Sequence, residues 1–168
     1  RARSTVSMNA LKEGIRVWDR DINRFLTSDY VPLYNPVEEY LYDTGRWDGK
    51  DRIRALADLV PCHNPHWQEL FYRWFLGMVA HWRGMDRQHG NNTSPLLVGS
   101  QGFRKSTFCR ILLPPELRFG YTDSIDFKSR QEAERSLGRF LLVNIDEFDQ
   151  ININQQGFLK HLLQKPVA

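Results

Sequence analysis

In the second half of the chain, an apolar run of strand length leads into a glycine-containing turn and then into a segment with helical spacing. The apolar run is 95–98, the turn is 99–107, and the helical spacing covers 106–113. Lys105 and two hydroxyl residues stand at the start of the helical segment. This order of strand, glycine turn, lysine and serine is the context in which such a pattern forms a phosphate-binding loop. The chain is therefore predicted to contain an α/β nucleotide-binding core.

Each residue type in the turn suits phosphate binding for a physical reason. Glycines allow backbone N–H groups to point inward at phosphate oxygens, and the helix N-terminus adds a partial positive charge. Lys105 is predicted to reach the outer phosphates, and the Ser106 hydroxyl to ligate Mg²⁺. The predicted phosphate-binding residues are Gly99, Ser100, Gln101, Gly102, Phe103, Arg104, Lys105, Ser106 and Thr107.

Arg104 departs from the usual pattern, which has glycine immediately before the lysine. A side chain at this position crowds the loop if the backbone needs a positive φ, whereas an arginine could instead add a contact to phosphate. Taken alone, the run 99–107 is compatible with a working site or with an ordinary strand-to-helix turn.

An acidic pair supplies the second half of the predicted site. The apolar run 140–145 is typical of a strand buried on both faces, and it ends in Asp146 and Glu147. Ligands of α/β sheets bind at the carboxyl ends of the strands. Asp146 is predicted to hold Mg²⁺ with Ser106, and Glu147 to orient and deprotonate the attacking water. With Lys105 as the other catalytic residue, the sequence predicts binding and hydrolysis of ATP with Mg²⁺.

The first half of the chain is predicted to be helical and rich in aromatic residues. Apolar spacing predicts helices over 11–26, 53–60 and 67–82, the last closed by Gly84. The segment 31–51 breaks this period and is predicted to hold a short helix, 36–42, between two loops. The aromatic residues of 67–82 are expected to form core rather than a surface on which bases stack. Packing anchors are also predicted in the connecting segment, at Tyr34, Tyr40, Tyr42 and Trp47.

A polar connection with three turn residues, 90–92, suits a domain boundary. The predicted domains are a helical subdomain, 1–92, and the N-terminal part of a P-loop ATPase core, 93–168. In the second domain, Ser129 with Glu132 has the form of a capping box that starts a helix, and a last helix follows Asn154.

Composition bounds the function without selecting one. The net charge is +3 with a pI near 9.0, and the basic excess is spread thinly, which permits nucleic-acid binding without arguing for it. Only two cysteines occur, and no stretch approaches the roughly 18 consecutive apolar residues of a spanning helix. We therefore expect a cytoplasmic protein with reduced thiols.

Three stretches of the chain resemble the virulence-associated protein E family. One combines 35–37 with 40–41, a second is Trp-Asp-Gly-Lys-Asp-Arg-Ile at 47–53, and the third consists of the two motifs described above. The ATPase domain of this family is related to superfamily 3 helicases within the AAA+ class. The resemblance extends over residues 30–168, and the segment 47–53 is its most specific part.

The resemblance implies a role in replicating mobile DNA, by an ATP-driven ring helicase or loader that acts on DNA beside a primase. It implies phosphate and Mg²⁺ contacts for Lys105 and Ser106, Mg²⁺ binding for Asp146 and catalysis for Glu147, and it assigns no DNA-contacting residue. Such domains continue through strands that carry a sensor residue and an arginine finger. We therefore expect 168 residues to be a truncated core, with slow hydrolysis on its own.

Other functions remain open at this point. The chain could be a nucleotide-responsive binding or oligomerisation module, or a structural protein with a decayed P-loop, which Arg104 favours. A small-molecule kinase fits the adjacent Asp-Glu pair less well. A zinc site at Cys62, His63, His66 and His81 lacks the paired cysteines that such sites normally show.

Overall fold

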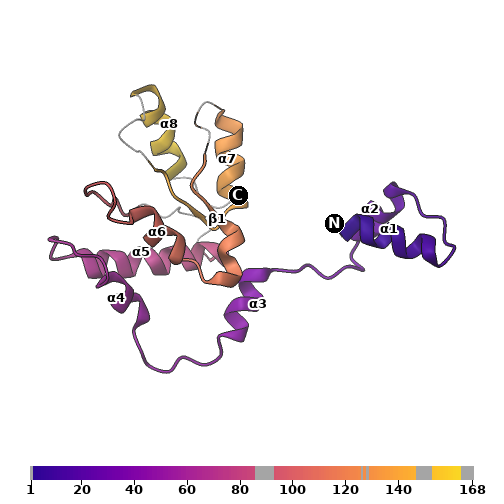
Figure 1. The fold of residues 1–168 in the computed structure, drawn as a ribbon, viewed down its shortest axis with the longest axis horizontal. Helices are drawn as coiled ribbons and strands as arrows, with labels where there is room; N and C mark the ends of the chain where they lie inside the picture. Colours follow the sequence, from indigo (N-terminus) through magenta and orange to yellow (C-terminus); the bar gives the residue numbers. More distant parts are fainter. Residues whose placement is uncertain (1, 86–92, 126, 128, 147–152, 164–168) are drawn as a thin grey trace. The chain divides into compact units, whose positions relative to one another are not determined.

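The computed structural model describes residues 2–85, 93–125, 127, 129–146 and 153–163. The chain divides into two compact units, Arg1–Asn35 and Pro36–Ala168, which are described separately below (Figure 1). The predicted boundary at residue 92 lies outside the described residues and stays a prediction. Among the described residues, no helix is both long and apolar enough to cross a bilayer.

The first unit consists of two helices, α1 (Ala2–Lys12) and α2 (Asp19–Leu26). The prediction of one helix over 11–26 is therefore wrong. Gly14 adopts a φ of +72°, and the N–H groups of Gly14 and of the next residue bond back to carbonyls of the last turn of α1, at 3.1 and 2.9 Å. Glycine enters this left-handed conformation at little cost, so α1 ends here although the apolar spacing continues.

The second unit carries the remaining elements. They are α3 (Pro36–Asp43), α4 (Arg52–Ala57), α5 (Trp67–Trp82), α6 (Lys105–Ile111), the 3₁₀ helix η1 (Pro115–Gly120), β1 (Tyr121–Thr122), α7 (Arg130–Arg139), β2 (Leu142–Val143) and α8 (Ile153–Leu163). The helices predicted in this unit are confirmed, although α4 ends at Ala57, before the predicted end at 60. The predicted helix start at Ser129 is confirmed too, because its hydroxyl accepts the Glu132 N–H at 3.3 Å.

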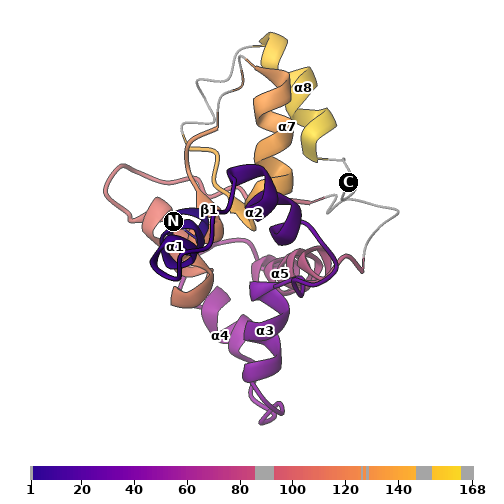
Figure 2. The same cartoon turned by 90° about the vertical axis from the view of Figure 1, so that its right-hand side faces the viewer.

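The sheet of this unit is a parallel pair of very short strands. Tyr121 lies opposite Leu142 and Thr122 opposite Val143, and α7 makes the crossover between the two strands, as parallel pairing requires. The predicted strand 140–145 is thus shortened to β2, and β1 was not predicted. Figures 1 and 2 show α7 and α8 side by side.

The predicted strand at 95–98 is not formed. Leu96 and Val98 are 64% and 87% exposed, and no described residue pairs with this segment as a strand. Burial and a neighbouring strand stabilise a central parallel strand, and 95–98 has neither. The described fold is therefore mostly helical with one small parallel pair, a coarser architecture than the predicted α/β core.

One apolar core supports both predicted motifs. It consists of buried residues from α4, from α5 and from the end of α6 at its C-cap (Ala57, Phe71, Trp74, Met78 and Leu112), with Phe108 of α6 and Leu142 of β2 packed against it. The Trp82 indole N–H also donates to the Leu141 carbonyl at 2.7 Å. The prediction that the aromatic residues of α5 form core is confirmed, and α5 holds α6 and β2 beside each other.

The prediction of packing anchors between the first helices and α4 is wrong at three of four positions. Tyr34, Tyr42 and Trp47 are exposed, and Tyr40 is half-buried. The helix α3 instead buries Val37. An aromatic side chain without helical or strand spacing has no fixed face, so its burial cannot be inferred from its type alone.

Candidate nucleotide site

The turn before α6 has the backbone conformation that its glycine pattern suggests. Gly102 has a φ of +88°, and Arg104 has φ +55° and ψ +31° at the N-cap of α6. Among the described residues, Arg104 is the only non-glycine with positive φ. A left-handed backbone costs a residue with a side chain roughly 1–2 kcal/mol. Arginine thus occupies a glycine conformation at the position where the phosphate-loop pattern has glycine.

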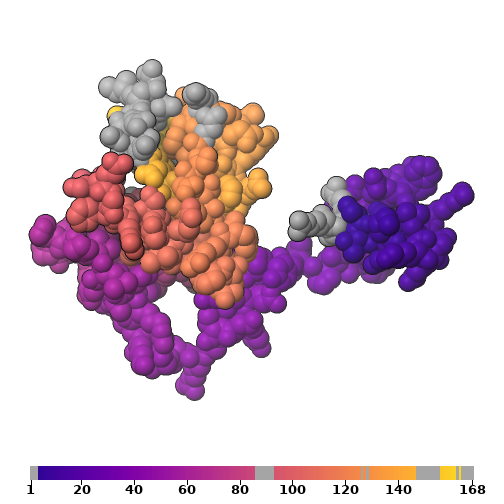
Figure 3. Space-filling model, viewed as in Figure 1, coloured from indigo at the N-terminus to yellow at the C-terminus, as the bar shows by residue number. Residues whose placement is uncertain are grey.

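The loop lies at the surface of the second unit (Figure 3). Residues 98–104 are exposed, and a Cβ added at Gly99 or Gly102 would meet no atom within 4 Å. Space therefore remains beside the loop backbone. The predicted site residue Thr107 is also exposed, whereas Lys105 and Ser106 are half-buried in the first turn of α6.

Lys105 folds back onto the loop. Its ammonium Nζ donates to the carbonyl oxygens of Gly99 at 2.8 Å and Ser100 at 3.0 Å. These contacts hold the positive charge of the ammonium group beside the first two residues of the loop. A phosphate oxygen is a stronger partner for an ammonium than a neutral carbonyl, so an anion can recruit this side chain.

Ser106 and Asp146 lie in direct contact. The Ser106 hydroxyl donates to Asp146 Oδ2 at 2.8 Å, although 40 residues separate them in sequence. The serine sits on α6, and the aspartate follows β2. A hydroxyl and a carboxylate supply oxygen ligands of the kind that Mg²⁺ takes from proteins, together with waters and substrate phosphates. The residues present therefore fit the predicted ion.

Glu147, the predicted catalytic base, lies outside the described residues, and its role stays a prediction. In the described part of the chain, no group of three His, Cys, Asp or Glu side chains could hold a metal ion, at Cys62 or elsewhere. A magnesium site of this kind does not need three such side chains, because the protein often supplies only one or two ligands and waters or substrate phosphates supply the rest.

Cys109 lies one turn after Ser106 on α6 and is half-buried. Burial raises the pKa of its thiol, and the negative charge of Asp146 raises that pKa further. The thiol therefore stays protonated at neutral pH and behaves as a small packing residue. This environment makes Cys109 a packing residue rather than a nucleophile.

A second carboxylate at the same sheet edge was missed from the sequence. Asp123 follows β1 as Asp146 follows β2, and its Oδ2 accepts from Arg110 of α6 at 3.2 Å. The Arg110 guanidinium also lies 5.5 Å from the centroid of the Tyr121 ring. The only sequence signal was an aspartate after a two-residue strand, which is too short to recognise by periodicity.

Comparison with known proteins adds one match. A family model described as the virulence-associated protein E-like domain matches residues 41–167, which is well over half of the chain. No curated protein and no solved structure matches. The matched range includes the loop before α6, the Ser106–Asp146 contact and the Trp-Asp-Gly-Lys segment. The chain therefore belongs to the virulence-associated protein E-like family.

Proposed function

We propose that this chain binds ATP with Mg²⁺ through residues 99–107 and Asp146, and that it is a P-loop ATPase domain. The observation that carries the proposal is the 2.8 Å contact between the Ser106 hydroxyl and Asp146 Oδ2. Two motifs predicted to share one cation are distant in sequence and adjacent in space. An ordinary strand-to-helix turn gives no reason for that contact.

Each residue has a distinct role in the proposed site. The loop backbone presents N–H groups to the phosphates, and Lys105 exchanges its two carbonyl partners for phosphate oxygens. Ser106 and Asp146 would hold Mg²⁺, and the ion would neutralise charge on the phosphate oxygens. Glu147 orients the attacking water and accepts its proton.

The biological setting is proposed from the family. Membership supports a part in the replication of mobile DNA, as a helicase-like or primase-associated domain. DNA, a primase and further copies of the chain in a ring are the proposed partners, and the cytoplasm is the proposed compartment. The +3 net charge is compatible with DNA as a partner.

A decayed loop is the second candidate, and one observation favours it. Arg104 holds a positive φ of 55° beside the phosphate-binding turn, so its long side chain starts from the position where a glycine leaves room for phosphate. In that case the chain has a structural or interaction role and binds no nucleotide.

Magnesium dependence of nucleotide binding separates these candidates. We expect a fluorescent ATP analogue to bind the wild-type chain more tightly with Mg²⁺ than with EDTA. Ser106→Ala and Asp146→Asn should reduce this difference, because changes to the groups around a bound metal typically cost roughly tenfold or more in metal affinity. Ser129→Ala is the matched control, since it removes a hydroxyl that caps α7.

Equal binding with Mg²⁺ and with EDTA would contradict the metal site. Retention of the full magnesium effect in both variants would do the same. Absence of binding under all conditions would favour the decayed loop.

A further inference from the structure

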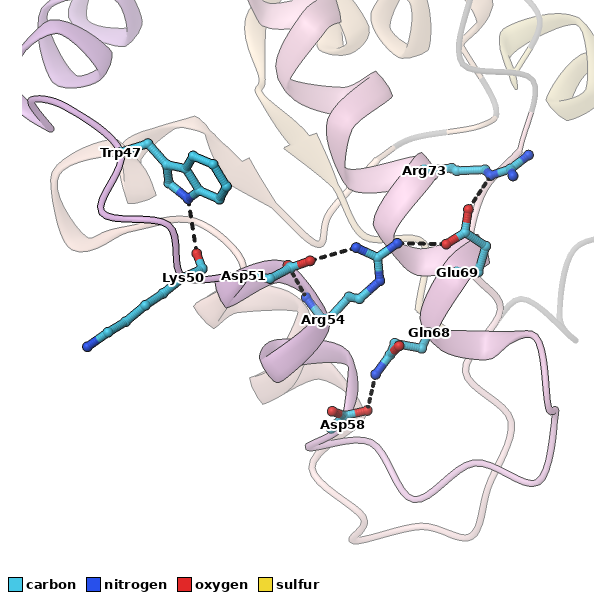
Figure 4. A network of polar contacts seen from close by, with 8 residues as sticks. All are labelled: Trp47, Lys50, Asp51, Arg54, Asp58, Gln68, Glu69 and Arg73. Carbon is cyan, nitrogen blue, oxygen red and sulfur yellow. Dashed lines mark hydrogen bonds and ion pairs between the residues drawn. The ribbon is translucent and has the colours of Figure 1, made fainter.

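Trp47, between α3 and α4, is oriented but not packed. Its indole N–H donates to the Lys50 carbonyl at 3.1 Å, yet the residue is 75% exposed (Figure 4). Trp67 and Trp82 make similar indole bonds, to Ala57 and Leu141, but both pack against the core. The Trp47 hydrogen bond thus fixes a large aromatic ring at the surface.

The turn that carries Trp47 is braced by charged groups. Asp48 accepts the Lys50 N–H at 3.1 Å and takes both Nη atoms of Arg52 at 2.7 Å. Asp51 caps α4 by accepting the Arg54 N–H at 3.0 Å. Bidentate arginine–carboxylate pairs have a defined geometry, so this pair favours the conformation that the turn adopts here.

The brace continues into the core helix α5. Arg54 bridges Asp51 at 2.6 Å and Glu69 at 2.8 Å, and its guanidinium lies 3.9 Å from the centroid of the Tyr72 ring. Glu69 also pairs with Arg73 at 2.7 Å (Figure 4). The exposed tryptophan is therefore tied through two ion pairs to the best-packed part of the unit.

Charge is distributed unevenly around this turn. The two aspartates within the segment 47–53 are each paired with an arginine, Asp48 with Arg52 and Asp51 with Arg54. Arg46 and Lys50 are exposed, and in the described part of the chain no carboxylate pairs with either side chain. In Figure 4 the Lys50 side chain points away from the network. Two exposed cations thus stand on either side of the exposed ring in the sequence, one directly before it and one three residues after it.

We propose that Trp47, Arg46 and Lys50 form a contact site for single-stranded nucleic acid. A base stacks on the indole face, and the adjacent phosphates contact the two cations. A duplex hides its base faces, so the single strand is the form that this ring can bind. The inference deepens the proposed action on DNA and rests on it, but the contact itself needs no ATP.

The test is binding of a fluorescently labelled oligothymidylate to the whole 168-residue chain without nucleotide, measured by anisotropy. We expect Trp47→Ala to weaken binding by roughly tenfold or more, because loss of one stacking ring has about that effect. Trp47→Phe should keep most of the affinity. Lys50→Ala and Arg46→Ala should each lower the slope of log affinity against log salt by about 0.7.

Trp18→Ala is the matched control, since Trp18 is 70% exposed and lies in the first unit. Binding should also quench wild-type tryptophan fluorescence, and Trp47→Phe should reduce the quench while binding persists, which a folding defect would not produce. The proposal is overturned if the wild type does not bind the oligonucleotide, if Trp47→Ala binds as well, or if Trp18→Ala loses as much.

ATP binding measured in parallel separates this proposal from the proposed function. Trp47→Ala should bind ATP as the wild type does. A loss of ATP affinity in Trp47→Ala with unchanged oligonucleotide binding would reassign the ring to the nucleotide base and overturn the proposal.

Discussion

Arg104 shows how one residue can leave a motif in place and still alter its energetics. The backbone at this position takes a φ of +55°, which glycine adopts freely and other residues adopt at a cost of roughly 1–2 kcal/mol. The sequence alone does not show whether residue 104 needs a positive φ, because φ cannot be inferred from residue type. The structure shows that it does adopt a positive φ.

Arg104→Gly is expected to leave stability unchanged or raise it by up to about 1 kcal/mol. Relief of the left-handed backbone is partly offset by the roughly 0.5–1 kcal/mol that glycine loses in conformational entropy. Urea unfolding measures the difference. Arg83→Gly is the control, because Arg83 has a φ of −86° at the end of α5 and should only lose stability. Equal losses in the two variants would contradict the assigned strain.

Cys109 reports on the neighbouring carboxylate. Its thiol pKa is raised by burial and by the charge of Asp146, so the folded state holds the proton more tightly than the unfolded state. The resulting stabilisation is present below the ordinary thiol pKa of about 8.5 and is lost as the pH rises through the folded value. The same raised pKa slows alkylation, because the thiolate is the nucleophile.

We therefore expect iodoacetamide to modify the exposed Cys62 faster than Cys109 at mildly alkaline pH. Asp146→Asn should raise the alkylation rate of Cys109, because removing the negative charge lowers the pKa of its thiol. The alkylation rate of Cys62 should not change, so Cys62 is the internal control. Peptide mass analysis measures both rates. An unchanged ratio of the two rates would mean that Asp146 does not lie beside α6.

At the scale of elements, the site depends on the approach of η1 to the segment before β2. Gly120 ends η1, is buried, and bonds through its carbonyl to the Leu141 N–H at 2.7 Å. A Cβ at Gly120 would lie 2.6 Å from Cγ of Leu141. Only a residue without a side chain permits the two strands to begin pairing here.

Gly120→Ala is expected to destabilise the chain by roughly 1–3 kcal/mol, the usual range for overpacking. In a Leu141→Ala background, Gly120→Ala should cost less stability than it does in the wild type, because the clashing side chain is shortened. Gly138→Ala is the control, since a Cβ there meets nothing within 4 Å on α7 and alanine favours a helix. Thermal unfolding compares the variants, and a neutral Gly120→Ala would contradict the described contact.

The helices show which elements a sequence can predict. Spacing predicted α5 because a long helix with one buried stripe is set by packing, and Ser129 with Glu132 predicted the start of α7 because a cap is local. The prediction of one helix over 11–26 was wrong because the backbone of Gly14 ends α1. The prediction of a strand over 95–98 was wrong because strand pairing depends on a partner elsewhere in the chain.

The candidate site was predictable to the same extent. Motif order predicted that Ser106 and Asp146 share a site, and their side chains are in contact. Asp123 was missed because β1 is only two residues long. Trp47 was misread as a packing anchor because it lies outside a helix or strand, where residue type alone does not show burial. Such features depend on tertiary contacts and leave little trace in spacing.

At the scale of the molecule, the elements that carry the predicted site of the second unit pack directly against its apolar core. The core that α4 and α5 form also contacts Phe108 of α6 and Leu142 of β2. A ligand that binds between α6 and the residues after β2 should therefore stabilise the unit as a whole. Stabilisation by a ligand depends on binding alone, so it needs no hydrolysis.

The most direct test of the proposed ATP site is thermal unfolding of the wild type and Lys105→Ala with saturating Mg-ATP, with Lys160→Ala of α8 as the control. At about 100 times the dissociation constant, binding to the native state alone adds about 2.7 kcal/mol, which raises the midpoint by several degrees. We predict this shift in the wild type and in Lys160→Ala, and its loss in Lys105→Ala. No shift in the wild type, or the same shift in Lys105→Ala, would contradict the site.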